Sequence, residues 1–217
     1  MHKKITIIHT TIATVTSIPV LIKKMYDDFE IVNILDDSML NDIKEKGYLT
    51  KDVIERFVQY VIISKNNGSD AILLACSSIG EAGDIARKII DIPLFKIDEP
   101  MAELAVKKGK RILVLGTVQS TLLPTSKLIK SKVTDTAQTV ECKLIPDVFE
   151  LYTINREKHD QKIAEVIEEN QDKFDVIVLA QASMSGATHY IDDKRTEILT
   201  SLPLGLIQLK DIVEKKS

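Results

Sequence analysis

The sequence contains no tryptophan, few other aromatic residues and only two cysteines. Aromatic side chains make up 5% of the 217 residues, so the hydrophobic core must be mostly aliphatic. Cys76 and Cys142 could form at most one disulfide bond, and neither belongs to a C-x-x-C pair or another metal-ligand spacing. The sequence therefore argues against a disulfide-based fold and a cysteine metal site. It favours a reduced, cytoplasmic protein.

The sequence also lacks a strong charge excess and a long apolar run. Its formal net charge is −3, and the basic residues are spread among acidic ones, so no nucleic-acid partner is expected. No run reaches the roughly 18 uninterrupted apolar residues of a membrane span, so no membrane partner is expected either. The apolar N-terminal stretch is interrupted by His9 and several threonines, and no small-residue cleavage site follows it. A signal peptide is therefore not expected.

The most informative stretch is Asp70–Ala86, which reads D-A-I-L-L-A-C-S-S-I-G-E-A-G-D-I-A. Residues 71–75 form an unbroken apolar run, which is typical of a strand buried in a parallel sheet, and Cys76 ends it. Ser78 with Glu81 fits a capping box, so a helix is predicted to begin there. Its predicted apolar face comprises Ile85, Ile89 and Ile90. Backbone N–H groups at this point would favour an anion, either a substrate carboxylate or the thiolate itself. A cysteine that only packs in the core is the alternative.

Apolar runs alternate with helical patterns through the first half of the chain. The predicted strands are residues 5–8, 31–35, 71–75 and 93–97. Helices are predicted through residues 21–26, 53–63, 78–90 and 98–107, with Gly109 as the last C-cap. This alternation predicts βαβ units and a parallel sheet. No G-x-G-x-x-G follows the first strand, which argues against a nucleotide-binding Rossmann domain.

From Arg111 the pattern begins again at an offset of about 105 residues. The segment D-V-I-V-L-A-Q-A-S-M from Asp175 repeats the segment from Asp70, so that Gln181 matches Cys76. Thr117 likewise falls where Thr10 stands in the first half. The sequence thus predicts an α/β protein of two pseudo-symmetric lobes, each a mostly parallel sheet flanked by helices, facing each other across a cleft. The predicted lobes are residues 1–97 with 204–217, and residues 98–203.

Three motifs together resemble the aspartate/glutamate/hydantoin racemase superfamily over nearly the whole chain. They are A-C-S-S at Ala75–Ser78, L-G-T at Leu115–Thr117, and A-Q-A-S-M at Ala180–Met184 in the place of a second cysteine motif. The resemblance implies a cofactor-independent isomerase of amino-acid metabolism that acts on a small carboxylate or amino acid. It also implies that no metal is needed and that a homodimer is possible. The implied substrate-binding residues are Thr10, Thr11, Ser77, Ser78 and Thr117. His9, which ends the first predicted strand, and Ser183 are further candidates for substrate binding.

The sequence departs from the family pattern at Gln181. In the family's racemases two thiols flank the α-carbon, and one removes the proton while the other delivers one. Cys76 is the first of these thiols, but an amide at residue 181 neither accepts nor donates a proton usefully near neutral pH. We therefore interpret Cys76 and Gln181 as the catalytic pair of a racemase-like enzyme with a single thiol.

Several alternatives remain open at this stage. A second base could come from His9 or from Asp36 and Asp37, which end a predicted strand. A one-thiol decarboxylase or lyase of the same superfamily would need no second base. A protein that binds small acids without chemistry is a further alternative. Cys142 is expected to be structural, and His189 lies too far from residue 181 to take over the role of a family histidine.

Overall fold

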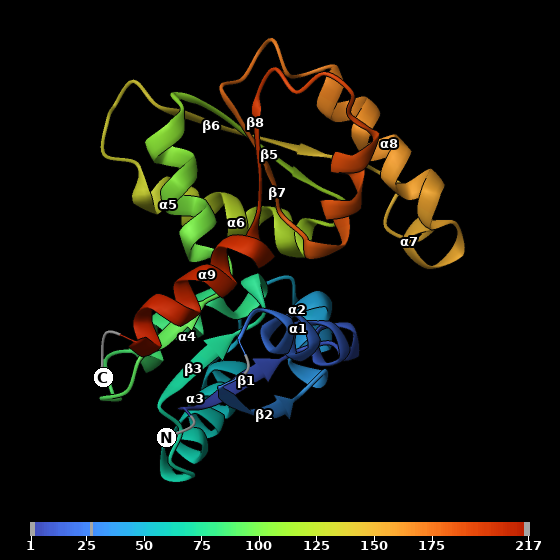
Figure 1. The fold of residues 1–217 in the computed structure, drawn as a ribbon. Helices are drawn as coiled ribbons and strands as arrows, with labels where there is room; N and C mark the ends of the chain where they lie inside the picture. Colours follow the sequence, from blue (N-terminus) through green and yellow to red (C-terminus); the bar gives the residue numbers. More distant parts are fainter. Residues whose placement is uncertain (1–2, 27, 215–217) are drawn as a thin grey trace. The chain divides into compact units, whose positions relative to one another are not determined.

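Each half of the chain forms a four-stranded parallel sheet covered by helices (Figure 1). The computed structural model describes residues 3–26 and 28–214. The chain divides into two compact units, Met1–Ile97 with Leu206–Ser217 (unit 1) and Asp98–Gly205 (unit 2). The ends of the predicted first lobe, residues 1–2 and 215–217, lie outside the described residues. The predicted α/β class and the pseudo-symmetric duplication are confirmed.

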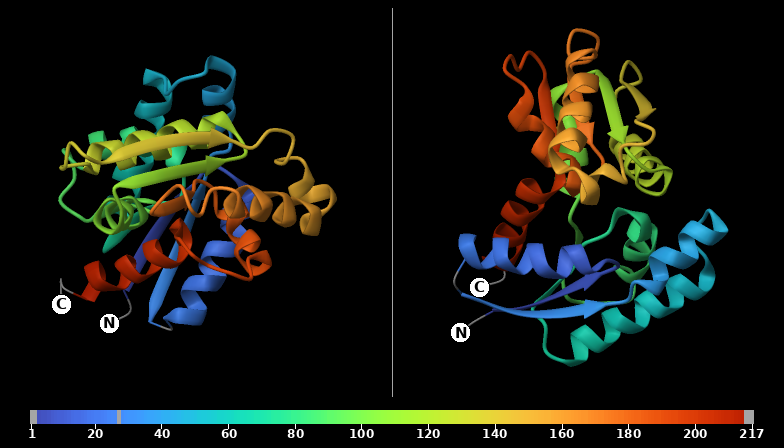
Figure 2. Two further views of the ribbon diagram at one scale, coloured as in Figure 1. Left: turned by 90° about the horizontal axis from the view of Figure 1, so that it is seen from above. Right: turned by 90° about the vertical axis from the view of Figure 1, so that its right-hand side faces the viewer.

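Unit 1 has the strand order β2-β1-β3-β4. Its strands are β1 (Lys3–His9), β2 (Phe29–Leu35), β3 (Ala71–Leu74) and β4 (Leu94–Lys96). Its helices are α1 (Ile12–Met25), α2 (Ser38–Lys46), α3 (Lys51–Asn66), the 3₁₀ turn η1 (Ser77–Ile79) and α4 (Gly80–Ala86). Helix α9 (Ser201–Glu214) starts in unit 2 and continues into unit 1. The right-hand view of Figure 2 shows α1 on one face of the sheet and α3 on the other.

Unit 2 repeats this order as β6-β5-β7-β8. Its strands are β5 (Arg111–Gly116), β6 (Thr139–Leu144), β7 (Val176–Leu179) and β8 (Glu197–Thr200). Its helices are α5 (Glu99–Lys108), α6 (Gln119–Lys132), α7 (Leu151–Ile154), α8 (Arg156–Glu168) and the 3₁₀ segment η2 (Ala182–Tyr190). Alternate residues of the central strands bury opposite faces, as expected for strands in the middle of a parallel sheet.

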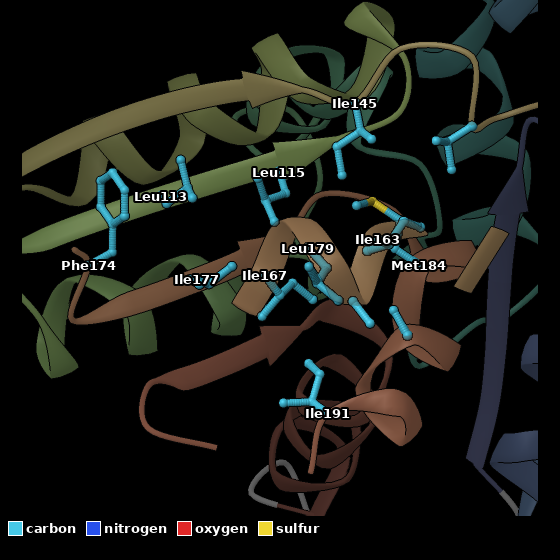
Figure 3. Packing of buried hydrophobic residues seen from close by; sticks show 13 residues of the cluster. Leu113, Leu115, Ile145, Ile163, Ile167, Phe174, Ile177, Leu179, Met184 and Ile191 are labelled. Carbon is cyan, nitrogen blue, oxygen red and sulfur yellow. The ribbon is translucent and has the colours of Figure 1, made fainter. Parts of the chain in front are cut away.

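The two faces of the unit 2 sheet have separate cores. Leu113, Ile177 and Leu179 pack against residues of α8 and η2, and Figure 3 shows this cluster with Met184 from η2 among its members. Ile112 and Val176 point to the opposite face, where α5 and α6 contribute the partners. The 3₁₀ segment η2 is therefore held in place by a core that it helps to form. It begins shortly after the central strand β7, just as η1 begins shortly after β3.

The duplication extends to the register of the central strands. Ile5 pairs with Ala71 in unit 1, and Ile112 pairs with Val176 in unit 2. The aspartate before each third strand also has the same task. Asp70 Oδ2 accepts from the Lys4 amide at 2.8 Å, and Asp175 Oδ2 accepts from the amides of Lys110 and Arg111 at 2.9 Å. The repeated aspartate is therefore explained by a bond that ties the third strand to the start of the first.

Asp175→Asn is expected to make the free energy of unfolding of unit 2 depend less on pH in acidic solution. Hydrogen bonds from the Arg111 amide and guanidinium lower the pKa of Asp175 from 3.8 to about 2. A lowered folded-state pKa adds stability above about pH 4, and this contribution is lost as the pH falls toward 2. Because the carboxylate is one-third exposed, we expect the variant's free energy of unfolding to be lower by only about 1 kcal/mol at neutral pH. Urea unfolding at several pH values measures it, and a gap between wild type and variant that persists at pH 2 contradicts the assignment.

The helix after Cys76 differs from its prediction. Residues Ser77–Ile79 form a 3₁₀ turn, and α4 starts only at Gly80, with Ile79 as an N-cap that makes no side-chain capping bond. The helix ends at Ala86, so its predicted extension through Ile90 is wrong. Gly80 and Gly83 are consistent with the short helix, since two glycines in seven residues weaken it. Gly83 packs closely, because a Cβ there would lie 3.0 Å from Leu74 Cδ2, and the leucine side chain would have to shift by a few tenths of an ångström.

Candidate functional site

The candidate site in unit 1 is formed by the loops that follow β1 and β3. These strands are neighbours, and the Ala75 amide donates to the Ile8 carbonyl at 3.0 Å, which keeps the two loops side by side. Thr10 follows β1 and is buried, whereas Cys76 follows β3 and is partly exposed. Polar side chains of both loops therefore gather at the carboxyl ends of adjacent strands, where parallel sheets bind ligands. The predicted residues lie at or just after the ends of these two strands: His9 is the last residue of β1, Thr10, Thr11 and Cys76 lie in the loops, and Ser77 and Ser78 begin η1.

Cys76 is the extended N-cap residue of η1, with φ −150° and ψ 118°. Burial of its sulfur raises the pKa of the Cys76 thiol above its ordinary value. The Thr10 hydroxyl, the Ser78 and Ile79 amides and the Ser78 hydroxyl lie close to the sulfur and oppose this shift without overcoming it. The resting group at neutral pH is therefore a thiol, surrounded by donors that can stabilise a thiolate once the proton has left.

His9 is fully buried and has a partner at each ring nitrogen. Nδ1 lies 2.9 Å from Thr14 Oγ1, and Nε2 lies 3.0 Å from Asn33 Oδ1. Burial lowers the pKa of His9, although the hydrogen bond to Asn33 works in the opposite direction, so the ring is neutral at neutral pH. Because both nitrogens are engaged, the geometry gives His9 the task of holding the start of α1. Thr14 and Asn33 were not singled out by the sequence, since a threonine in a helix and an asparagine in a strand carry no motif.

Asp36 also has its hydrogen bonds directed to the protein. Its carboxylate accepts from the Ser38 hydroxyl at 2.5 Å and from the Tyr60 hydroxyl at 3.0 Å, and it pairs with Arg56. Burial acts to raise the pKa of Asp36, but these bonds and the charge of Arg56 lower it overall. Asp36 therefore anchors the start of α2 to α3. Asp37 next to it is exposed.

In unit 2 the corresponding loops bring Thr117 and Gln181 together. Gln181 is the extended N-cap residue of η2, with φ −131° and ψ 138°, the same place that Cys76 has before η1. Its Oε1 accepts from the Thr117 amide at 2.7 Å and from the Thr117 hydroxyl at 3.0 Å. Both residues are buried, and Gln181 keeps 9% of its surface exposed. The sequence predicted both positions but not the contact between them.

A cluster of charged and polar side chains from α8, formed by Arg156, His159 and Asp160, bonds to η2. Arg156 Nε donates to Asp160 Oδ2 at 2.9 Å, and its Nη2 donates to the carbonyl of Ser183, which is itself only partly buried. The other oxygen of Asp160 lies 2.7 Å from Nδ1 of the fully buried His159. Sequence analysis missed this cluster. The spacing of Arg156 and Asp160, four residues apart on one helix, was the available signal.

The two residues set aside in the sequence lie away from these loop ends. Cys142 is exposed on β6, and His189 is exposed near the end of η2, where Nδ1 lies 3.1 Å from the Gly186 carbonyl. Within residues 3–26 and 28–214, no group of three or more His, Cys, Asp or Glu side chains could hold a metal ion. Nor does that part of the chain contain a helix long and apolar enough to cross a membrane.

Several solved structures share this fold over nearly the whole chain. Glutamate racemase isoform RacE1 from Bacillus anthracis matches with a TM-score of 0.74 at 21% identity, over 100% of this chain and 83% of that one. Allantoin racemase from Klebsiella pneumoniae matches with a TM-score of 0.71 at 14% identity, over 99% and 89% of the two chains. Unliganded arylmalonate decarboxylase matches with a TM-score of 0.64 at 13% identity, over 99% and 94%.

The sequence comparisons are consistent with the fold. No curated protein sequence gives a match. The family model for Asp/Glu/Hydantoin racemase matches residues 8–203, which include seven of the eight strands in full, the end of β1, and the loops with Cys76 and Gln181. This range covers most of the chain, and the chain therefore belongs to the Asp/Glu/hydantoin racemase family.

Proposed function

We propose that the protein is a cofactor-independent enzyme that transfers a proton at the α-carbon of a small carboxylic or amino acid, with Cys76 as its only catalytic thiol. The observation that carries this proposal is that the two matched positions of the duplication hold different residues, a thiol in unit 1 and an amide in unit 2. Cys76 precedes η1, and Gln181 precedes η2 with its amide oxygen engaged by Thr117. A carboxamide is not a base or an acid near neutral pH, so proton transfer would use one face of the substrate. That Cys76 and Gln181 flank one substrate stays a prediction.

The surroundings of Cys76 support a role as an acid. A thiol with a raised pKa holds its proton at neutral pH and can give it to an α-carbanion. The S–H bond breaks, a C–H bond forms, and the electron pair left on sulfur is stabilised by the Thr10 hydroxyl and the Ser78 and Ile79 amides. The reverse step removes a proton from the same face. In this proposal Thr11 and Ser77 supply hydroxyl donors to the substrate carboxylate.

The raised pKa of Cys76 favours a second candidate, a decarboxylase or lyase. In a decarboxylation the electrons of the bond to the departing CO₂ move to the α-carbon, and a protonated thiol is the form needed to complete the product. The thiolate then regains its proton from water. A fold match to arylmalonate decarboxylase is compatible with this reaction, although a match at 13% identity concerns the fold alone.

The proposal is tested by incubating the protein in D₂O with single enantiomers of aspartate, glutamate and 2-substituted carboxylic acids, and with substituted malonates. Proton NMR should show exchange of the α-proton in one enantiomer or loss of CO₂ from a malonate, and chiral chromatography should show that the exchanged substrate keeps its configuration. Racemisation at a rate equal to exchange would contradict the single-thiol assignment. Neither exchange nor CO₂ release with any of these acids would favour a binding protein without chemistry.

A further inference from the structure

Gln181 is fixed in one orientation by its contacts with Thr117. An amide N–H and a hydroxyl both point at the same side-chain oxygen, which identifies that atom as the carbonyl Oε1 and leaves Nε2 on the other side of the carboxamide. Nε2 donates no hydrogen bond to any residue that the structure describes. Gln181 is nevertheless 91% removed from solvent as a residue, since only 9% of its surface is exposed. Nε2 is not one of the buried polar atoms that lack a partner, so its two unused N–H groups keep contact with solvent and are open to an acceptor.

The same contacts change the role that the family resemblance implies for Thr117. The resemblance makes the Thr117 amide and hydroxyl donors for a substrate carboxylate. In this chain both groups already bond to Gln181 Oε1, at 2.7 and 3.0 Å. A ligand that used Thr117 would first have to displace two good hydrogen bonds from a buried carbonyl, which weakens its binding. A ligand that used Gln181 Nε2 would break no hydrogen bond within the described residues.

We propose that Gln181 is the ligand-binding group of unit 2, and that it uses its Nε2 amino group to bind a carboxylate oxygen of a small acid. Thr117 is then a positioning residue, which holds the carboxamide through Oε1. Two hydrogen bonds accepted at Oε1 also polarise the amide, which strengthens Nε2 as a donor. The inference rests on the proposed function only in taking the ligand to be a small carboxylate. It makes Gln181 a recognition residue in the place of a thiol.

The test is an NMR titration of ¹⁵N-labelled full-length protein with sodium malonate, succinate and L-aspartate as probes. The Gln181 Nε2 signals are assigned by their absence in Gln181→Glu. At least one probe should shift these signals, while the Thr117 amide proton stays slow to exchange with solvent. If none of the three acids moves the Nε2 signals, or if the Thr117 amide becomes the group that shifts, the inference is overturned.

Two matched variants separate recognition from positioning. Gln181→Glu keeps an acceptor for Thr117 but replaces the donor with a negative charge, so affinity for the bound probe should fall about tenfold or more. Thr117→Val removes only the hydroxyl bond and keeps the backbone bond, so affinity should fall less than about threefold. If Gln181 merely blocks Thr117, Gln181→Ala should tighten probe binding by freeing both donors. Tighter binding in Gln181→Ala, or an equal loss in Thr117→Val and Gln181→Glu, would overturn the inference.

The titration is repeated in Cys76→Ser so that the two proposals can fail separately. Binding needs no proton transfer, so the shift of the Gln181 Nε2 signals should persist in this variant. Absence of α-proton exchange in wild type together with a clear Nε2 shift refutes the proposed chemistry and leaves the recognition role standing. Exchange without any Nε2 shift supports the proposed chemistry and refutes the recognition role of Gln181.

Discussion

Substitution of Cys76 by alanine is expected to lower the rate of α-proton exchange by about 10³-fold. The proposal gives this thiol the whole of the proton transfer, and neither His9 nor Asp36 is placed to replace it. His9 has a partner at both ring nitrogens, and Asp36 is held by Ser38, Tyr60 and Arg56. Proton NMR in D₂O measures the exchange rate of each variant with the best substrate of the panel.

Two controls accompany Cys76→Ala: removal of the other cysteine, and replacement of Cys76 by serine. Cys142→Ala should leave exchange unchanged, because Cys142 is exposed on β6 away from the strand-end loops. Cys76→Ser keeps a hydrogen-bonding group of similar shape but has a far weaker acid, so it should be nearly as inactive as Cys76→Ala. Exchange that survives in both Cys76 variants would show that the proton is carried by another group.

The pH profile provides an independent check on the acid role of Cys76. Its pKa is raised by burial, so the protonated form that delivers the proton predominates at neutral pH and is lost only as the pH rises through this value. Protonation of the carbanion left by decarboxylation should therefore slow in alkaline solution, whereas α-proton exchange, which begins with the thiolate, should not. Alkylation by iodoacetamide should show the opposite trend, since only the thiolate reacts, and should be slow at neutral pH. Fast alkylation at neutral pH would contradict the raised pKa.

The sequence predicted the sheets better than the site. Strand runs such as 71–75 are nearly continuous apolar segments, and burial on both faces leaves few other structures for them. The repeated aspartates gave the register of the two halves, because Asp70 and Asp175 both bond to the backbone at the start of the first strand. These signals are local in sequence, and sequence reasoning can therefore find them.

The site depends on contacts between distant residues, and these left no local signal. A helix start after Cys76 suggested a stabilised anion, but η1 is a short 3₁₀ turn and burial of the sulfur raises the pKa instead. The bond from Thr117 to Gln181 spans 64 residues and could not be inferred from either motif. Gln181 stood out as the loss of a thiol. Its fixed carboxamide is visible only in the structure.

Gly186→Ala is expected to destabilise unit 2 by about 2–4 kcal/mol. A Cβ at this position would lie 2.1 Å from Asp160 Oδ2 and 2.8 Å from Asp160 Cγ. Asp160 cannot move away cheaply, because its side chain is buried and bonds to both Arg156 and His159. A shift would leave a carboxylate and two polar partners poorly satisfied inside the protein. Urea unfolding followed by circular dichroism measures the change in the free energy of unfolding.

A glycine that has room for a methyl group serves as the matched control for Gly186. At Gly80 the nearest atom to an added Cβ is Lys96 Cδ at 3.5 Å, and the residue is helical, so Gly80→Ala should be neutral or slightly stabilising. The mechanism itself is tested by a double-mutant cycle with Asp160→Ala, which removes the clashing carboxylate. In that background Gly186→Ala should cost much less than in wild type. An equal cost in both backgrounds would show that the clash with Asp160 is not the cause, and the support of η2 by Arg156 and Asp160 would then need another explanation.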